Sequence, residues 1–413
     1  MKRLNDAQQN SKGAGNRLGM AVLLGLLATF GSLSMDMYLP GIPTIAQDFQ
    51  TSASLVQLSL TACLLGLAGG QIVIGPFSDA KGRKRPLLFF LLIYMVSSIL
   101  CMYAPTIGVF IALRFIQGFS ASAGVVISRA IVRDLYSGEE LTKFFALIVL
   151  AVGISPILAP VLGGVVLQVT TWQGVFGVLA ILTLMIGVVV FIALPETLPQ
   201  AKRSKGGIKQ TVRTFGDLIK NKTFMGYALA QGLIMAGIFA YVSGTPFVYQ
   251  GIYGVSPQVF SILFAMNGIG IVLGSRMTGR LSSKFPESKI LSTGLFGSIV
   301  ASLILLLMIF IKAPLVFIVI PLFLIVSCIG IVQTTCFSLA METQGNHAGS
   351  ASALLGLLPY MLGAISAPLV GIAGESTAIP MGLTIMIADL GALASYLFLV
   401  RKQAPSRKWL NKR

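Results

Sequence analysis

Charged residues are scarce in this sequence: Asp, Glu, Lys and Arg make up 10% of its 413 residues, whereas hydrophobic residues make up 55%. Soluble domains carry roughly a quarter charged residues, so this composition excludes an ordinary soluble protein. The chain also has a single histidine and only four cysteines, none of them in a CxxC pair. It therefore offers neither clustered metal ligands nor the framework of a disulfide-stapled domain.

Motifs for nucleotide chemistry and hydrolysis are absent as well. No GxxxxGK[ST] loop, HExxH or GxSxG occurs, and no soluble connector is long enough for a nucleotide-binding domain, which excludes ATP-driven transport by this chain. The lone His347 stands at the start of an apolar run, and we interpret it as a solvated interfacial residue rather than a proton relay. We expect no enzyme activity, no metal and no cofactor.

Long apolar runs are what the sequence has in abundance. Twelve are long enough to cross a bilayer, at about 18–39, 53–77, 86–104, 107–129, 143–168, 172–194, 223–248, 257–279, 289–311, 314–338, 348–372 and 378–400. They lack the alternating pattern of barrel strands, so each must be a helix that satisfies its own backbone. The first run is too long for a signal-peptide core. The predicted fold class is an all-α integral membrane protein with twelve transmembrane helices.

Basic residues are distributed unevenly among the connectors. Of 30 Lys and Arg, 28 lie on the side that carries the N-terminus, Lys312 lies on the opposite side, and Arg114 falls inside the fourth run. The positive-inside rule then predicts an even number of spans and cytoplasmic termini. The net charge of +17 thus indicates orientation in a lipid bilayer, and we expect a multi-pass protein of the cell membrane with no nucleic-acid partner.

An internal repeat divides the chain into two six-span halves. Pro40 corresponds to Pro246, the segment 75–78 to 279–282, and 159–163 to 367–371, each pair separated by 204 to 208 residues. Two parallel six-span halves are typical of transporters whose substrate site lies between the halves. The predicted boundaries are a tail at 1–18, a first half at 19–194, a basic linker at 195–222, a second half at 223–400 and a basic tail at 401–413.

Three ionisable residues lie well inside predicted spans, away from the span ends, where a charge is costly and usually functional. Asp36, about two thirds of the way across the first span, is interpreted as a carboxyl group that exchanges a proton for substrate; the alternative is a residue at the outer interface. Arg114 must meet an acid, carbonyl groups or water, and structural and functional roles are equally plausible. Asp389 is interpreted as a structural or lipid-interface residue.

Two segments combine small residues with prolines or charges. In the loop 75–86, Asp79 can attract a helix N-terminus or the nearby Arg129 and Arg133 in one state of the protein; the alternative is a tight turn. The fifth span contains Gly153, Pro156, Pro160, Gly163 and Gly164, which favour close packing and a bend. Ordinary helix packing explains the second pattern equally well.

These segments resemble signatures of the major facilitator superfamily, and within it of the Bcr/CflA (bicyclomycin-resistance) type of drug:proton antiporter. The loop 75–84 is similar to the signature between spans two and three, and 114–118 to the span-four Arg-x-x-Gln-Gly signature. The stretch 153–164 is similar to the antiporter signature, with Ala159 in place of the usual Gly. Cues of the Bcr/CflA type are 36–40, 129–136, 195–199 and 246–249, and the resemblance covers about residues 19 to 400.

The resemblance implies the major facilitator fold and a set of roles. Proton coupling would involve Asp36 and Arg114, and it would rest more heavily on Asp36 because position 28, where related exporters can carry a second acid, is Ala. A cytoplasmic gate would contain Gly75, Asp79, Gly82, Arg83, Lys84 and Arg133, and the glycines and prolines of the fifth span would serve helix packing.

The expected function is proton-driven export of amphipathic drugs or other small molecules by a monomer. From depth alone, a substrate pocket would contain Met35, Tyr38, Tyr241, Asn267 and Tyr360, because aromatic and Met side chains adapt to varied apolar ligands. The alternative is a proton-coupled transporter, importer or exporter, of a specific metabolite such as a sugar or amino acid derivative. A receptor or channel would leave the repeat unexplained.

Overall fold

The computed structural model describes residues 2–136, 138–203, 215–342, 344, 348–374 and 376–401. The first half comprises α1 (Lys2–Asp36), η1 (Leu39–Gly41), α2 (Ile42–Asp48), α3 (Ala53–Lys81), α4 (Lys84–Met102), α5 (Ile107–Leu135), α6 (Gly138–Val169) and α7 (Trp172–Ala193). The linker contains η2 (Gln200–Lys202). The second half comprises α9 (Lys222–Thr245), η3 (Pro246–Ile252), α10 (Pro257–Leu281), α11 (Glu287–Phe310), α12 (Leu315–Glu342), α13 (Ala348–Leu369), α14 (Ile379–Ser395) and η5 (Tyr396–Val400).

Within these ranges there are no strands, and 12 helical segments are long and apolar enough to cross a membrane. The predicted fold class is therefore confirmed. The predicted end of the first span at residue 39 is wrong, because that span runs to Asp48. Pro40 ends α1 but does not end the span. Pro40 and Pro43 lie in the first turns of η1 and α2, a position that suits proline, and the chain continues through both.

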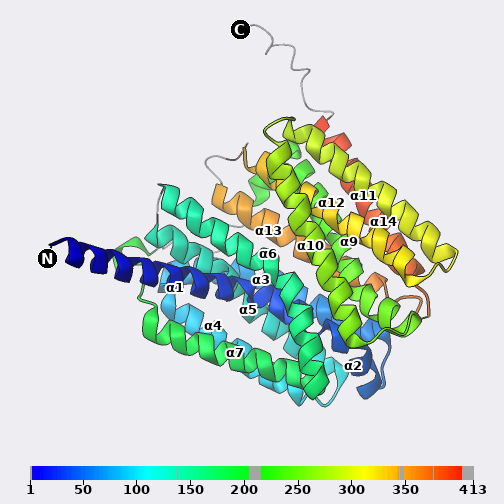
Figure 1. The fold of residues 1–413 in the computed structure, drawn as a ribbon, viewed down its shortest axis with the longest axis horizontal. Coiled ribbons are helices and arrows are strands. Elements are labelled where there is room, and N and C mark those ends of the chain that lie inside the picture. Colours follow the sequence, from blue (N-terminus) through cyan, green and yellow to red (C-terminus); the bar gives the residue numbers. More distant parts are fainter. Residues whose placement is uncertain are drawn as a thin grey trace, which may run out of the picture.

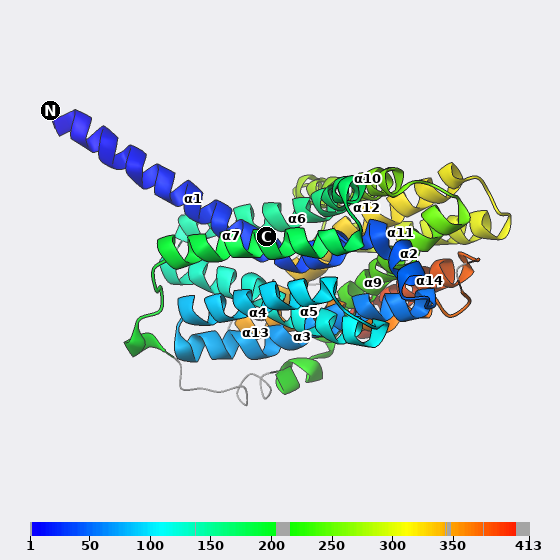
Figure 2. The same ribbon diagram turned by 90° about the horizontal axis from the view of Figure 1, so that it is seen from below.

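The two halves repeat the same packing plan. In the first half α3 packs along α5, and in the second half its counterpart α10 packs along α12. The matching prolines also occupy matching irregularities, since Pro40 lies in η1 and Pro246 begins the π-helical turn η3. Figures 1 and 2 show α4 and α7 on the side of the molecule opposite α11 and α14. The internal repeat inferred from sequence is thus a repeat of structure.

Helices α3 and α13, and helices α6 and α10, form the most extensive contacts between the halves. We call the end of the bundle where α3, α5 and α7 finish the basic end, and the opposite end, where α2 lies, the far end. Figure 1 shows the two halves meeting at the far end and diverging toward the basic end.

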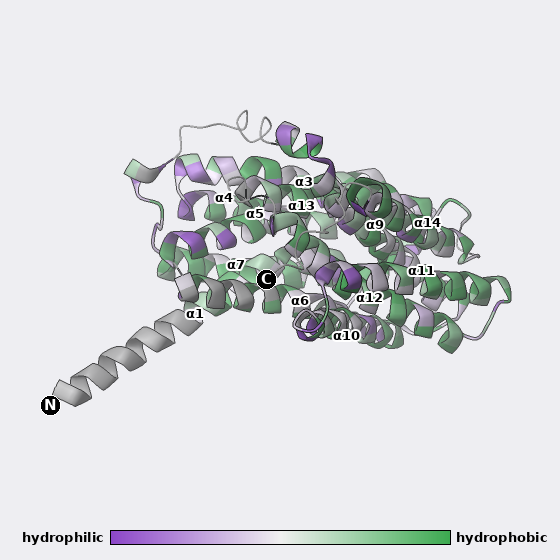
Figure 3. Cartoon of the chain, turned by 90° about the horizontal axis from the view of Figure 1, so that it is seen from above, coloured by the Kyte–Doolittle hydropathy of each residue, from purple (hydrophilic) through white to green (hydrophobic). Residues whose placement is uncertain are grey.

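The outer surface of the bundle is apolar. Helix α7, for example, exposes more than half of the surface of Met185, Phe191 and Ile192. The helices in Figure 3 are hydrophobic along much of their length, with hydrophilic residues at several helix ends. An exposed apolar surface of this extent is stable only against lipid. The lipid bilayer is therefore the medium in which this bundle folds.

Candidate functional site

Asp36 is the last residue of α1, at the point where the α-helix of the first span is interrupted. Its side chain is 5% exposed, and no hydrogen bond or ion pair joins it to any other described residue. The groups within electrostatic range include the phenols of Tyr241 and Tyr360, both from the second half. Asp36 thus faces the other half as a buried acid without a cation partner.

The second half contributes a polar wall opposite Asp36. Asn267 of α10 donates a hydrogen bond from Nδ2 to the Tyr241 hydroxyl of α9 at 2.8 Å, and the Tyr241 ring stacks on Phe264 with the ring centroids 5.2 Å apart. Tyr360 of α13 is half-buried and lies 6.0 Å from Phe239, centroid to centroid. Three of the five residues predicted for the pocket are therefore near Asp36.

Arg114 lies inside the first half and is completely buried. Nη1 donates to Gln117, whose amide in turn donates to Ser98 on α4 at 2.7 Å. The guanidinium carbon lies 4.3 Å from the centroid of the Tyr38 ring and 5.6 Å from that of Phe176. Nε and Nη2 have no hydrogen-bond partner in the described chain, so cation–π contacts and one amide hold a charge that no carboxylate neutralises.

This cluster changes two expectations about Tyr38 and Arg114. Tyr38 does not line the space between the halves, because its ring covers Arg114 and its hydroxyl is 3.2 Å from that of Ser59. Among the described residues, no hydrogen bond or ion pair joins Arg114 to Asp36. Met35, the fifth predicted pocket residue, is 5% exposed.

A network at the basic end joins three parts of the chain. Arg83, in the turn between α3 and α4, contacts Asp79 at 2.5 Å and Asp134, at the end of α5, at 2.8 Å. Thr197, which follows α7, donates to Asp134 at 3.2 Å. Glu196 accepts the backbone N–H of Arg83 at 2.8 Å. The turn, the end of α5 and the start of the linker are therefore held as one unit.

The same contacts set the pKa values of this network. Burial lowers the pKa of the Arg83 guanidinium, but hydrogen bonds to Asp134 and Asp79 outweigh it and raise the pKa above its ordinary value. Burial likewise raises the pKa of the Glu196 carboxyl, but the backbone amides of Arg83, Leu198 and Lys84 outweigh it and hold the pKa below its ordinary value. Both groups are charged at neutral pH.

Other residues of the predicted gate lie around this network. Gly82 has φ +96, which only glycine adopts readily, and it permits the turn. The Lys84 ammonium donates to the carbonyl oxygen of Phe191 at 2.8 Å, which ties α4 to the end of α7. Gly75 is not required sterically, because a Cβ there would lie 3.6 Å from Val126. Asp79 pairs with Arg83 rather than with Arg129 or Arg133, which corrects the expected partner.

The glycines of the fifth span differ in how closely neighbouring atoms approach them, and the difference follows their position along the helix. A methyl group on Gly163 would overlap the carbonyl oxygen of Met37 in the first span, and a Cβ on Gly164 would lie 2.5 Å from Oγ of Ser261 in the second half. Gly153 has nothing within 4 Å. Pro156 and Pro160 lie within α6, which continues from Gly138 to Val169. The pair at the far end therefore permits close packing, both within the first half and between the halves.

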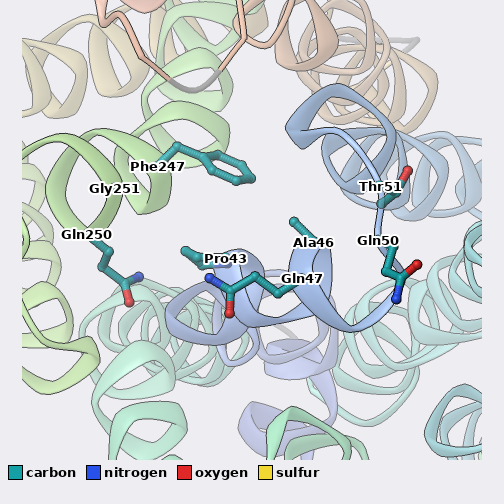
Figure 4. A pocket seen from close by; sticks show the side chains of 8 residues that line it. All are labelled: Pro43, Ala46, Gln47, Gln50, Thr51, Phe247, Gln250 and Gly251. Atoms are coloured by element: carbon teal, nitrogen blue, oxygen red, sulfur yellow. The ribbon is translucent and has the colours of Figure 1, made fainter.

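A hollow of about 310 Å³ lies at the far end between α2 and η3. Figure 4 shows Gln47 and Gln250 on its two sides, with Pro43, Ala46 and Phe247 nearby. Its lining contains neither Asp36 nor any residue of the predicted pocket. It is a recess at the junction of the two halves, where the first and seventh spans end.

The described residues contain no group of three His, Cys, Asp or Glu side chains that could hold a metal. His347 lies outside the described residues. Asp389 is 1% exposed and accepts a hydrogen bond from Ser298 of α11 at 2.8 Å. It therefore lies in the protein interior, which supports the structural interpretation and makes the lipid-interface alternative wrong.

Comparisons with known proteins agree with the fold. Residues 24–368 match the Major Facilitator Superfamily. The chain is 51% identical to an uncharacterized MFS-type transporter, YdgK, of Bacillus subtilis (strain 168), covering 92% of this chain and 95% of that one. It is 31% identical to a bicyclomycin resistance protein homolog of Haemophilus influenzae, covering 93% and 96%. The solved D-xylose-proton symporter shares the fold, with a TM-score of 0.73, 15% identity and coverage of 94% and 98%.

Proposed function

The chain belongs to the major facilitator superfamily of membrane transporters, and from that premise we propose that it exports drugs or other amphipathic small molecules in exchange for protons. The observation that carries the proposal is the position of Asp36. It is an acid without a partner, buried at a break in the first span, and it faces the polar wall of the opposite half.

The proposed cycle uses Asp36 as the proton carrier. An unpaired carboxylate in apolar surroundings is costly, and binding a proton removes its charge. Entry of a substrate between Asp36 and the Tyr241–Asn267 pair changes the surroundings of the carboxyl group, so substrate and proton compete for the site. Rocking of the halves then exposes the site to the two sides of the membrane in turn, and the proton gradient supplies the driving force without a cofactor.

In this proposal, the distribution of Lys and Arg determines the orientation of the protein in the membrane. The positive-inside rule assigns the basic end and both termini to the cytoplasm. The protein would then lie in the cell membrane and take substrate from the cytoplasm through the basic end. A monomer contains both halves and is sufficient for this cycle.

The network of Arg83, Asp79, Asp134 and Glu196 is proposed to act in the cytoplasmic gate. It fixes the ends of α3 and α5 to the start of the linker, so these elements move together. The name of the bicyclomycin resistance protein homolog supports drug export over the alternative of a transporter for a specific metabolite. That alternative draws support from the hydrogen-bonded Tyr241–Asn267 pair, which offers directional contacts to a polar substrate.

The test is proton release from energised inverted vesicles on addition of bicyclomycin. Asp36→Asn keeps the size of the side chain but cannot carry a proton, and we expect it to abolish drug-dependent proton release. Asp389→Asn is the matched control: it also replaces a buried acid in a membrane span, and its amide oxygen can still accept the Ser298 hydrogen bond. Undiminished antiport by Asp36→Asn would refute the coupling role. Accumulation of a labelled metabolite, rather than exclusion of drug, in expressing cells would favour the alternative.

A further inference from the structure

Arg129 lies in α5, six residues before the end of the helix, and its side chain is exposed to solvent. Val125 and Ser122, one and two turns earlier on the same face of the helix, are buried. A Cβ on Gly70 of α3 would overlap the Ser122 hydroxyl, and a Cβ on Gly31 of α1 would lie 3.7 Å from Val125, so this face of α5 is turned toward the rest of the bundle. An exposed side chain on an inward face lies in a recess between helices rather than on the outer surface.

This recess is shared with the second half. A Cβ on Gly356, one turn before Tyr360 in α13, would lie 3.1 Å from Oε1 of Gln71 on α3, next to the Gly70 that meets α5. Tyr360 is accordingly within electrostatic range of both Arg129 and Asp36. Arg129 therefore belongs to the same space between the halves as Asp36 and lies on its basic-end side. A compound that moves from the basic end to Asp36 would pass this guanidinium.

No described residue binds Arg129. The acids near the end of α5 are engaged elsewhere, since Asp79 and Asp134 both pair with Arg83, and no hydrogen bond joins Arg129 to the rest of the described chain. Structural arginines in membrane spans usually meet an acid or backbone carbonyl groups. Arg114, by comparison, donates to Gln117 and lies under two aromatic rings. The five N–H donors of Arg129 are free to meet a ligand.

We propose that Arg129 is a substrate-recognition residue, and that the site consequently takes neutral or anionic compounds rich in hydrogen-bond acceptors in preference to lipophilic cations. The inference rests on the proposed function and specifies its substrate class. A guanidinium binds carbonyl, nitro, hydroxyl and carboxylate oxygens through paired hydrogen bonds that are stronger than those between neutral groups. It also repels a cationic ligand.

The experiment measures equilibrium binding to the purified full-length protein in lipid nanodiscs, with no proton gradient. Bicyclomycin is the neutral, acceptor-rich compound, and tetraphenylphosphonium is the lipophilic cation. Arg129→Gln should weaken bicyclomycin binding about tenfold, as expected for loss of a charge-assisted hydrogen bond. It should leave tetraphenylphosphonium binding unchanged or tighter. Arg129→Lys keeps the charge but lacks the paired N–H donors of a guanidinium, and its affinity for bicyclomycin should lie between those of the wild type and Arg129→Gln.

Arg276→Gln is the matched control, because Arg276 is also an exposed arginine, five residues before the end of α10, and makes no bond to the rest of the described chain. The Arg276→Gln variant should bind both compounds as tightly as the wild type. An equal loss of both compounds in Arg129→Gln, or no loss of bicyclomycin, would overturn the inference. A wild-type protein that does not bind bicyclomycin would also overturn it. Failure of drug-dependent proton release with binding intact would instead refute the proposed antiport and leave the recognition role standing.

Discussion

Asp36, Arg114 and Asp389 are all ionisable residues in apolar helices, but their surroundings differ. Asp389 accepts a hydrogen bond from Ser298, and Arg114 is held by Gln117 and two aromatic rings. Asp36 has no partner among the described residues and faces the other half. Because an uncompensated charge in hydrocarbon costs several kcal/mol, the residue without a partner is the one for which proton binding is most useful.

Two glycines of the fifth span should respond differently to the same substitution. Gly163→Ala places a methyl group against the Met37 carbonyl and should destabilise the protein by roughly 1–3 kcal/mol, the usual cost of overpacking. Gly153→Ala has free space around it and should be neutral or slightly stabilising, because alanine favours helix by up to about 1 kcal/mol. Thermal unfolding in detergent, followed by size-exclusion chromatography, measures both. Equal melting temperatures for the two variants would contradict the close approach at Gly163.

Some site residues could be identified from the sequence because charged residues are rare in its apolar segments. Others could not, because the sequence does not show which way a side chain points. Asp36 and Arg114 stand out in an apolar background, and depth alone placed Tyr241 and Asn267 near the site. Depth does not show which face of a helix a residue occupies, which is why Tyr38 was assigned to the pocket although it covers Arg114. Asp134 and Glu196 lie in the segments 129–136 and 195–199 that carried the resemblance, but their pairing with the turn at Arg83 depends on tertiary structure.

At the scale of elements, the network at the basic end shows how three irregular segments support one another. The turn between α3 and α4 is short and has an unusual backbone at Gly82. Its N–H groups at Arg83 and Lys84 lie outside a helical ladder and are satisfied by the Glu196 carboxylate. One acid of the linker thereby caps the start of α4, an anion at a helix N-terminus being favourable.

The pKa of Glu196 gives this cap a pH dependence. The folded-state pKa lies below the ordinary value of 4.5, so the contribution of Glu196 to stability is complete above pH 4.5 and is lost as the pH falls through the folded-state pKa. We expect Glu196→Gln to lower the melting temperature at pH 7 and to show a smaller further decrease on acidification than the wild type. The difference in melting temperature between the wild type and Glu196→Gln, followed from pH 7 to below pH 4.5, isolates the contribution of Glu196 from those of other carboxyl groups. A constant difference across that range would rule out the cap.

The number and type of the helices could be predicted because a helix is the only open-ended structure that satisfies its backbone in lipid. Their ends could not all be predicted. The first span was expected to stop before Pro40, but its chain continues as η1 and α2 to Asp48. A proline marks a change in the helix, and only the structure shows that the span continues beyond it, with η1 packed against α6.

At the scale of the whole molecule, contacts between the halves indicate which side is closed. At the far end, Gln57 of α3 donates to the Ser243 carbonyl of α9 at 3.2 Å, and Gly164 approaches Ser261. Toward the basic end, Arg129 is open to solvent. The structure is therefore the state that is closed at the far end and open at the basic end, one of the two states that alternating access requires.

Gly371, just beyond α13, should control this equilibrium. A Cβ there would overlap the Gln57 amide and lie 2.6 Å from Oγ of Ser54 on α3, so Gly371→Leu should prevent closure of the far end. Overpacking one of two states by 1–3 kcal/mol shifts their ratio roughly tenfold. The reporter is a cysteine at position 129 in a variant whose four native cysteines are serine, labelled with a membrane-impermeant maleimide in inverted vesicles. We expect slower labelling in Gly371→Leu and no change in Gly187→Leu, where nothing lies within 4 Å of a Cβ. Equal labelling rates in both would show that closure at the far end does not determine access from the basic end.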